Sequence, residues 1–233
     1  MKAVFKREFR AYFTSPVGYV VLAVFLFFQG LYFSYMFSTG YSDITFVFSQ
    51  LFSIVLFVMP ILTMRLISED KKQRVDQALF TAPVSTYAII LGKFFAAFAV
   101  LAAATSVTLV YQLLLSMYAK LNWFVYLSNV AGLLLFGAAI IAVGVFVSSL
   151  TESQVIAAIG SFAISLVILT LDTIAEMVNI GFITKAVEWI SFSGRYSTFV
   201  LGILDYSNIV FFVSFVAVFL FLTVRILDKR RWA

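Results

Sequence analysis

The chain has 233 residues, a net charge of +5 and a hydrophobic content of 63%, whereas soluble globular domains are about 45–50% apolar. It has no Cys and no His, which excludes a disulfide, a thiolate or imidazole metal site, and a Cys or His nucleophile. These numbers predict an all-α membrane protein, with residues 1–233 forming a single domain and no catalytic or metal site.

The first segment, residues 1–14, predicts a helix that lies on the membrane surface. Phe5, Phe9 and Phe13 recur at i,i+4 spacing and form an apolar stripe. Basic side chains suited to lipid phosphates occupy the other faces: Lys6, Arg7 and Arg10. The helix should end before Pro16. The apolar run after it lacks a small-residue cleavage site, so we expect an uncleaved first membrane helix.

Six apolar runs are long enough for membrane helices, which need roughly 20 such residues. They are Val17–Phe37, Phe46–Leu62, Ala88–Met117, Trp123–Val147, Val155–Leu171 and Ile209–Val224. With Lys93 counted as a loop charge, these spans carry no charged side chain. Ion-driven transporters usually have acids or bases at membrane depth, so energy for uphill transport would have to come from outside the membrane.

The Lys and Arg residues predict how the chain is inserted. Thirteen lie in the N-terminus, in residues 65–93 and at the C-terminus, whereas three lie in the other loops, as Lys120, Lys185 and Arg195. The positive-inside rule therefore puts both termini and residues 65–85 in the cytoplasm, and residues 172–208 outside. We attribute the net charge to this bias and expect no nucleic-acid binding.

Residues 65–85, RLISEDKKQRVDQALFTAPVS, concentrate seven charged side chains between Arg65 and Asp76. Helical spacing predicts a short amphipathic helix over Ser68–Ala82 that ends at Pro83. One interpretation is a solvated loop that obeys the positive-inside rule. The other is a protein-docking surface, because the acids add nothing to orientation and mixed charge beside apolar side chains suits docking. The candidate docking residues are Glu69, Asp70, Lys71, Lys72, Arg74, Asp76, Gln77, Leu79 and Pro83.

The later spans contain small and polar side chains with two interpretations each. Small residues at four-residue spacing favour close helix packing over a substrate role: Ala138 and Ala142, then Ala157, Ser161 and Ser165. The most polar span carries Thr105, Ser106, Thr108 and Gln112, which could line a path or, for the hydroxyls, bond to their own helix. Residues 172–208 are half apolar and broken by glycines, which predicts short re-entrant helices.

Three segments resemble the membrane subunit of type-2 ABC exporters, most of all the gliding-motility-associated permease branch. They are REFRAYFTSPVGYV, SEDKKQRVDQALFTAPVSTYAIILGKF and GRYSTFVLGILDYSNIVFFVSFVAVFLFLT. The resemblance implies a half-transporter with an interfacial helix at Lys2–Phe13, an ATPase-coupling helix at Ser68–Ala82 and short outer helices within Asp172–Tyr206. Many members have Gly-Thr where this chain has Arg74-Val75, which affects the fit to the ATPase.

The chain has no G-x-x-x-x-G-K-[ST] phosphate loop, so ATP and Mg²⁺ are expected on a separate cytoplasmic ABC ATPase. The resemblance further implies a second permease half, as a homodimer or heterodimer, in the bacterial inner membrane. It leaves room for an extracytoplasmic auxiliary protein. The function expected is ATP-driven export of an amphipathic or lipid-linked substrate. The alternative is a membrane anchor or mechanotransmission scaffold without transport, and a channel is disfavoured because no filter or charged ring is visible.

Overall fold

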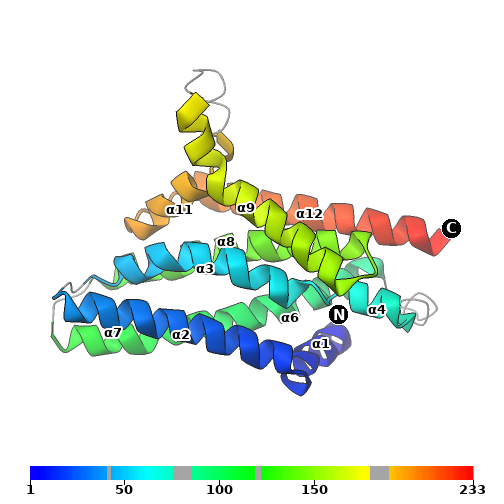
Figure 1. Cartoon of the computed structure of the whole chain (residues 1–233), viewed down its shortest axis with the longest axis horizontal. Helices are drawn as coiled ribbons and strands as arrows, with labels where there is room; N and C mark the ends of the chain where they lie inside the picture. The colour runs from blue at the N-terminus through cyan, green and yellow to red at the C-terminus, as the bar shows by residue number, and fades with distance from the viewer. Residues whose placement is uncertain (41–42, 76–84, 119–121, 179–188, 233) are drawn as a thin grey trace.

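The fold consists of long helices that run side by side, and the expected all-α membrane architecture with six spans is confirmed (Figure 1). The computed structural model describes residues 1–40, 43–75, 85–118, 122–178 and 189–232. Within these residues, six helical segments are long and apolar enough to cross a membrane. They are α2 (Pro16–Ser38), α3 (Thr45–Thr63), α6 (Thr86–Ser106) with α7 (Thr108–Ser116), α8 (Trp123–Leu150), α9 (Gln154–Val178) and α12 (Tyr206–Trp232).

Three shorter helices accompany the spans: α1 (Lys2–Thr14), α4 (Ser68–Lys72) and α11 (Phe192–Val200). Helix α1 is amphipathic and packs against α6 and α2. Ser15 is extended between α1 and α2, and Pro16 is the first residue of α2, where the missing N–H of proline costs no hydrogen bond. The chain therefore turns sharply from α1 into the first span, as the sequence predicted.

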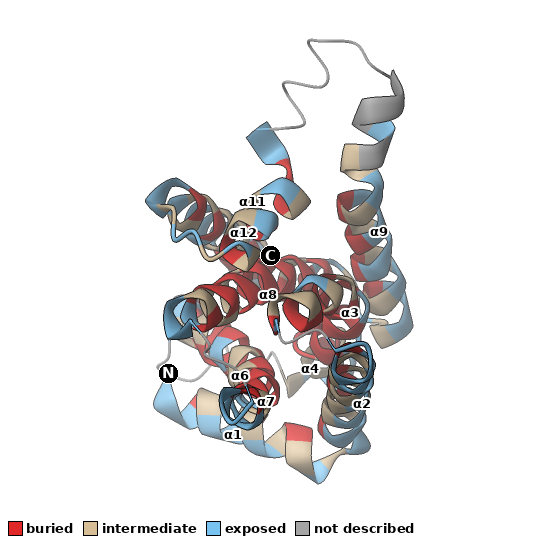
Figure 2. Cartoon of the chain, turned by 90° about the vertical axis from the view of Figure 1, so that its left-hand side faces the viewer, coloured by how far each residue is buried: buried red, intermediate tan, exposed pale blue. Residues whose placement is uncertain are grey.

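Helix α8 is the centre of the bundle. It packs against α3, α6, α9, α11 and α12, and Figure 2 shows its ribbon, coloured largely as buried, surrounded by the other helices. Its glycines allow close approach: a Cβ added at Gly144 would lie 2.0 Å from Thr63 Oγ1. The predicted packing residues Ala138, Ala142, Ala157, Ser161 and Ser165 are all buried. Helices α2, α9 and α12 keep most of their surface exposed at the periphery.

The third span is broken at Val107 between α6 and α7. Its hydroxyls bond back to their own helix, because Thr105 Oγ1 donates to the Leu101 carbonyl and Thr108 Oγ1 to the Thr105 carbonyl. Gln29 Nε2 of α2 donates to the Ala104 carbonyl at the break, over 3.2 Å. Of the two interpretations of these hydroxyls, intrahelical bonding is therefore the one observed, as expected where Thr side chains bond back to the preceding turn.

The outer segment differs from its predicted bounds. Helix α9 continues past Asp172 to Val178, so the segment begins inside a long helix. Helix α11 is the short helix within the described part of this segment, and residues 179–188 lie outside the described residues. Tyr196 Oη donates to the Phe48 carbonyl over 2.7 Å, and Ser128 Oγ donates to the Phe199 carbonyl over 3.0 Å. These bonds attach α11 to α3 and α8.

Candidate functional site

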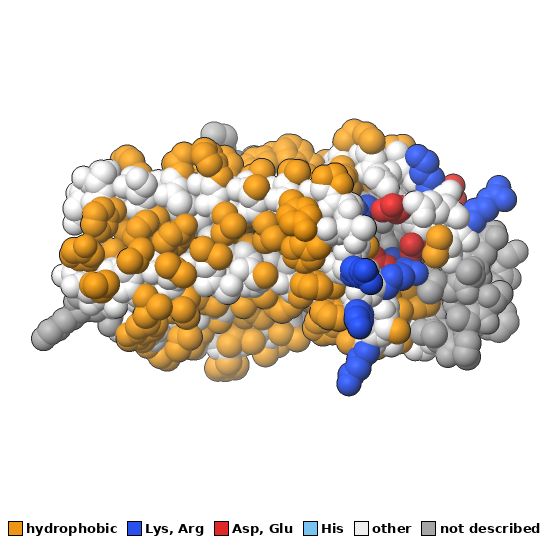
Figure 3. Space-filling view, turned by 90° about the horizontal axis from the view of Figure 1, so that it is seen from below, with side chains coloured by type: hydrophobic (Ala, Val, Ile, Leu, Met, Phe, Trp, Pro, Cys, Tyr) orange, Lys and Arg blue, Asp and Glu red, His pale blue; other side chains and the backbone are white. Residues whose placement is uncertain are grey.

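Charged side chains gather at one end of the molecule, where α1, α4 and the C-terminus of α12 meet (Figures 1 and 3). Both termini lie at this end, and α11 lies in the other half of the molecule. The C-terminal helix is joined to it by two polar contacts. Thr86 Oγ1 donates to Asp228 Oδ1 over 2.7 Å, and Arg230 Nη2 lies 2.7 Å from Glu152 Oε1 in the turn after α8. The C-terminus of α12 is therefore fixed to the start of α6 and to the turn after α8 at this end.

Four charged side chains from three helices form an ion cluster, which we call the Lys93 cluster: Arg7, Glu8, Asp70 and Lys93. Lys93 Nζ of α6 lies 2.9 Å from Glu8 Oε1 of α1 and 2.6 Å from Asp70 Oδ2 of α4. Arg7 Nη2 lies 2.5 Å from Glu8 Oε1 and 3.3 Å from Asp70 Oδ2. Two cations thus meet two carboxylates, and every cation contacts both acids.

Burial makes this cluster different from a surface ion pair. The side chain of Lys93 is 3% exposed, and those of Glu8 and Asp70 are 11% and 18% exposed. Burial favours the neutral form of Glu8, but the charges of Lys93 and Arg7 outweigh it, so the pKa of Glu8 is lowered. A charge at this depth needs a partner, and the cluster supplies one for each member.

The cluster corrects two expectations from the sequence. Lys93, counted as a cytoplasmic loop charge, lies inside α6 and is buried. Arg7, expected to face lipid phosphates, pairs with Glu8 and Asp70 although 43% of its side chain stays exposed. Glu8 was not singled out at all. One feature of the sequence could have indicated its role. Glu8 is the single acid in this basic helix, and it lies on the face that the Phe residues and the cations do not occupy.

Helix α4 is also bonded to the end of α8. The backbone N–H groups of Ile67 and Ser68 donate to Ser148 Oγ over 3.1 and 3.0 Å, and Lys71 Nζ donates to the Ser149 carbonyl. Ser148 therefore satisfies N–H groups at the start of α4, which a helix cannot pair internally. Asp70 and Lys71 were predicted to belong to the docking surface. In the structure Asp70 contacts Lys93 and Arg7, and Lys71 donates to the Ser149 carbonyl, so both side chains make contacts within the molecule. Their predicted role in docking stays a prediction.

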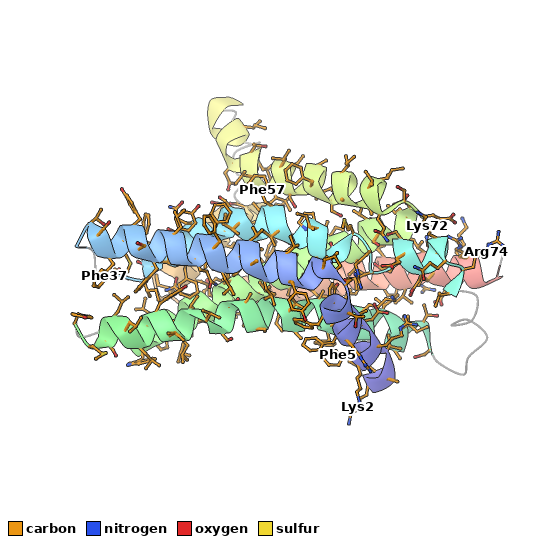
Figure 4. All side chains as sticks on the ribbon, turned by 60° about the horizontal axis from the view of Figure 1, so that its bottom comes forward. Lys2, Phe5, Phe37, Phe57, Lys72 and Arg74 are labelled. Atoms are coloured by element: carbon orange, nitrogen blue, oxygen red, sulfur yellow. The ribbon has the colours of Figure 1, made fainter. Side chains whose placement is uncertain are left out.

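The outward side of this segment is formed by Lys72, Gln73 and Arg74, all exposed. Figure 4 shows Lys72 and Arg74 at the end of the molecule. Arg74 has a φ of 57°, a left-handed conformation that a helix does not use. A single continuous helix over Ser68–Ala82 is therefore wrong, since α4 ends at Lys72. Asp76, Gln77, Leu79 and Pro83 lie outside the described residues, so their predicted roles stay predictions.

Glu69 contacts residues of its own segment, Arg65 and Gln73. It lies 3.6 Å from Arg65 as an i,i+4 pair, and it accepts a hydrogen bond from Gln73 Nε2 over 3.2 Å. These contacts leave its side chain 34% exposed. Surface pairs of this kind contribute about 0–1 kcal/mol, so Glu69 remains available to a docking partner.

Helix α1 is bonded to the bundle along its inner side. Tyr12 Oη donates to the Leu62 carbonyl over 3.0 Å, and the Arg65 guanidinium lies 5.3 Å from the centroid of the Tyr12 ring. Phe5, Phe9 and Phe13 contact one another in sequence and pack against the core. The side chains that face away from the bundle are basic: Lys2, Lys6 and Arg10. The predicted amphipathic helix is therefore present, fixed by hydrogen bonds and ion pairs.

The described residues show no metal-binding geometry at this end, since no three Asp or Glu side chains gather there. Each acid of the Lys93 cluster already contacts two cations. The arrangement can therefore join helices and present exposed cations.

Comparison with known protein families supplies the remaining observation. The family model described as ABC-2 type transporter matches residues 1–193. The chain belongs to the ABC-2 type transporter family. No curated protein matches it significantly. The chain is accordingly a membrane permease subunit of an ABC transporter, and the type-2 resemblance seen in the sequence is confirmed. The match includes α1, α4 and the whole Lys93 cluster.

Proposed function

We propose that this permease is one half of an ATP-driven export complex in a bacterial inner membrane. ATP and Mg²⁺ bind a separate cytoplasmic ATPase, and the exposed residues Lys72, Gln73 and Arg74, with Glu69 beside them, form part of its docking surface. The observation that carries the proposal is the position of α4. It exposes mixed charge at the end that holds both termini, and it is bonded to α1, α6 and α8.

The connections of α4 suit the transmission of force. A segment without contacts to other helices would move independently of them. By contrast, α4 contacts α1 through Arg7, α6 through Lys93 and α8 through Ser148. Displacement of α4 by a bound ATPase would therefore move three elements together. Packed interfaces of this kind convert small shifts into discrete rearrangements.

ABC ATPases work in pairs, so the permease family implies two permease halves. We propose a two-fold assembly, formed by two copies of this chain or by this chain and a related permease. The cargo proposed is amphipathic or lipid-linked, because Lys93 is the single charged side chain in the six apolar runs and it is already paired. An extracytoplasmic auxiliary protein on residues 172–208 is compatible with this arrangement.

The decisive experiment is purification of the chain from its own membrane, followed by mass measurement and ATPase assay. Two permease copies and two ATPase subunits are expected. The variant Lys72→Glu/Arg74→Glu should lose ATPase binding or its coupling to transport while the permease stays folded. Arg225→Glu is the matched control, because Arg225 is exposed at the same end in α12 and outside the proposed docking surface.

The second candidate is a scaffold that anchors a complex without transport. The specific observation in its favour is the density of fixed bonds at the end of the molecule that holds both termini. A single permease copy with no second membrane subunit, or unchanged ATPase binding and activity in the double reversal, would favour this candidate over the exporter.

A further inference from the structure

A polar hollow lies between α11 and the start of α12, in the half of the molecule away from the termini. Its volume is about 500 Å³, and its lining residues are Trp189, Gly194, Arg195, Thr198, Asp205, Ser207 and Asn208. The apolar run of α12 begins at Ile209, directly after this lining. Trp189 and Tyr206 beside it are 77% and 80% exposed, as is typical of aromatic side chains at a membrane–water boundary.

Arg195 is held rigidly in this hollow by uncharged groups. Nη1 donates to Asn208 Oδ1 over 2.8 Å, Nη2 donates to the Trp189 carbonyl over 3.0 Å, and the guanidinium lies 4.2 Å from the centroid of the Phe211 ring. Its Nε has no hydrogen-bond partner among the described residues. Within the described residues Arg195 contacts no carboxylate. Its positive charge is therefore fixed in place without a negative partner.

The polar groups around Arg195 are fixed as well. Asn208 is 5% exposed and donates through Nδ2 to Thr198 Oγ1 over 2.7 Å. Asp205 Oδ1 accepts from the Ser207 backbone N–H over 2.9 Å, and among the described residues its other oxygen has no partner. Among the described residues, the hollow thus presents one positive charge without a carboxylate partner and one carboxylate oxygen without a hydrogen bond, with hydrogen-bonding side chains between them.

We propose that this hollow binds the phosphoethanolamine headgroup of a membrane phospholipid. The phosphate lies against Arg195, whose planar guanidinium suits phosphate oxygens, and the ammonium group lies against Asp205. A zwitterion matches a site with one charge of each sign, whereas an anionic headgroup such as phosphatidylglycerol leaves Asp205 unpaired. This site would hold the lipid and so anchor α11 at the membrane boundary. It does not depend on ATPase docking or on transport.

The test is native mass spectrometry of the purified full chain in detergent, with phosphatidylethanolamine and phosphatidylglycerol added in equal amounts. The wild-type chain should retain more phosphatidylethanolamine. Arg195→Gln should weaken retention of both lipids by about tenfold, the effect of one charge-assisted hydrogen-bonded contact. Asp205→Asn keeps an acceptor for the Ser207 N–H and should abolish the preference between the two lipids.

Arg225→Gln is the matched control, because Arg225 also stacks on a phenyl ring, 4.9 Å from the centroid of Phe221, and lies near the other end of α12. It should leave retention unchanged. Inorganic phosphate is the third probe, and displacement of lipid by phosphate alone would overturn the lipid assignment. If Arg195→Gln fails to fold, the proposal is tested by the preference of Asp205→Asn between phosphatidylethanolamine and phosphatidylglycerol. An unchanged preference there overturns the proposal.

Discussion

The ammonium group of Lys93 lies 2.6 Å from Asp70 Oδ2, so a residue of the third span is joined directly to the short helix α4. The same nitrogen contacts Glu8 of α1. Neither contact is exposed enough for water to replace the partner easily, since the side chain of Lys93 is 3% exposed. Lys93 therefore joins α4 to the third span, beside the bonds that Arg7 of α1 and Ser148 of α8 make to the same segment.

Replacement of Lys93 by Met should destabilise the folded chain by about 2 kcal/mol. Loss of one partner from a fully buried pair costs about 3–5 kcal/mol, but here Arg7 remains beside both carboxylates and water partly reaches them. The thermal unfolding midpoint in detergent measures the effect. Glu8→Gln added to Lys93→Met should recover part of the loss, because it removes one acid left without its cation.

Lys72→Met serves as the control for this experiment. Lys72 carries the same charge two residues from Asp70, but it is exposed, and such surface substitutions usually change stability by less than about 0.5 kcal/mol. Equal midpoints for Lys72→Met and Lys93→Met would show that the buried pairs contribute nothing beyond surface charge.

The cluster also predicts a pH dependence. The pKa of Glu8 is lowered from its ordinary 4.5 by Lys93 and Arg7 against the opposing effect of burial. Its carboxylate therefore contributes stability that is fully present above about pH 4.5 and is lost as the pH falls through the folded-state value. The stability difference between wild type and Glu8→Gln should be constant near neutral pH and narrow below 4.5. A constant difference down to pH 3 would contradict this.

The sequence was sufficient to locate the spans. The predicted run Val17–Phe37 corresponds to the observed helix Pro16–Ser38, and the predicted run Phe46–Leu62 corresponds to the helix Thr45–Thr63. The agreement is close because bilayer thickness sets the length of an apolar helix. Amphipathic periodicity also located α1. Both features depend on neighbouring residues along the chain, so they can be predicted without knowledge of the packing.

The direction of the charged side chains could not be predicted in the same way. Periodicity shows that Asp70 and Lys71 differ in face from Lys72, but it does not show which element covers each face. Glu8 and Lys93 are 85 residues apart, and their pairing depends on how α1 crosses α6. The interruption at Arg74 was missed for a related reason, since a positive φ at a non-glycine residue has no local sequence signal.

Close packing of α8 on α3 gives a third prediction. Gly144→Ala would put a Cβ 2.0 Å from Thr63 Oγ1 and 2.7 Å from Thr63 Cβ, so the two helices must separate. Overpacking of this kind costs about 1–3 kcal/mol. Gly30→Ala is the matched control, because its nearest neighbour, Tyr111 Oη, would be 3.6 Å away. That substitution should leave the unfolding midpoint equal or slightly higher.

The final prediction is the orientation of the permease in the membrane. With Lys93 placed inside α6, twelve of the sixteen Lys and Arg residues still lie in the segments assigned to the cytoplasm, and the positive-inside rule then puts α4 inside and α11 outside. The chain has no Cys, so single substitutions can be labelled without background.

Gln73→Cys and Ser197→Cys are the two positions to compare, because both native side chains are exposed and they lie in α4's turn and in α11. An impermeant thiol reagent applied to intact cells should label Ser197→Cys and spare Gln73→Cys, and permeabilised cells should give both. Each variant thus controls for the other's accessibility. Labelling of Gln73→Cys in intact cells would put α4 on the outer side of the membrane. No ATP-binding subunit could reach Lys72 or Arg74 there, so the export mechanism proposed for this permease would be contradicted.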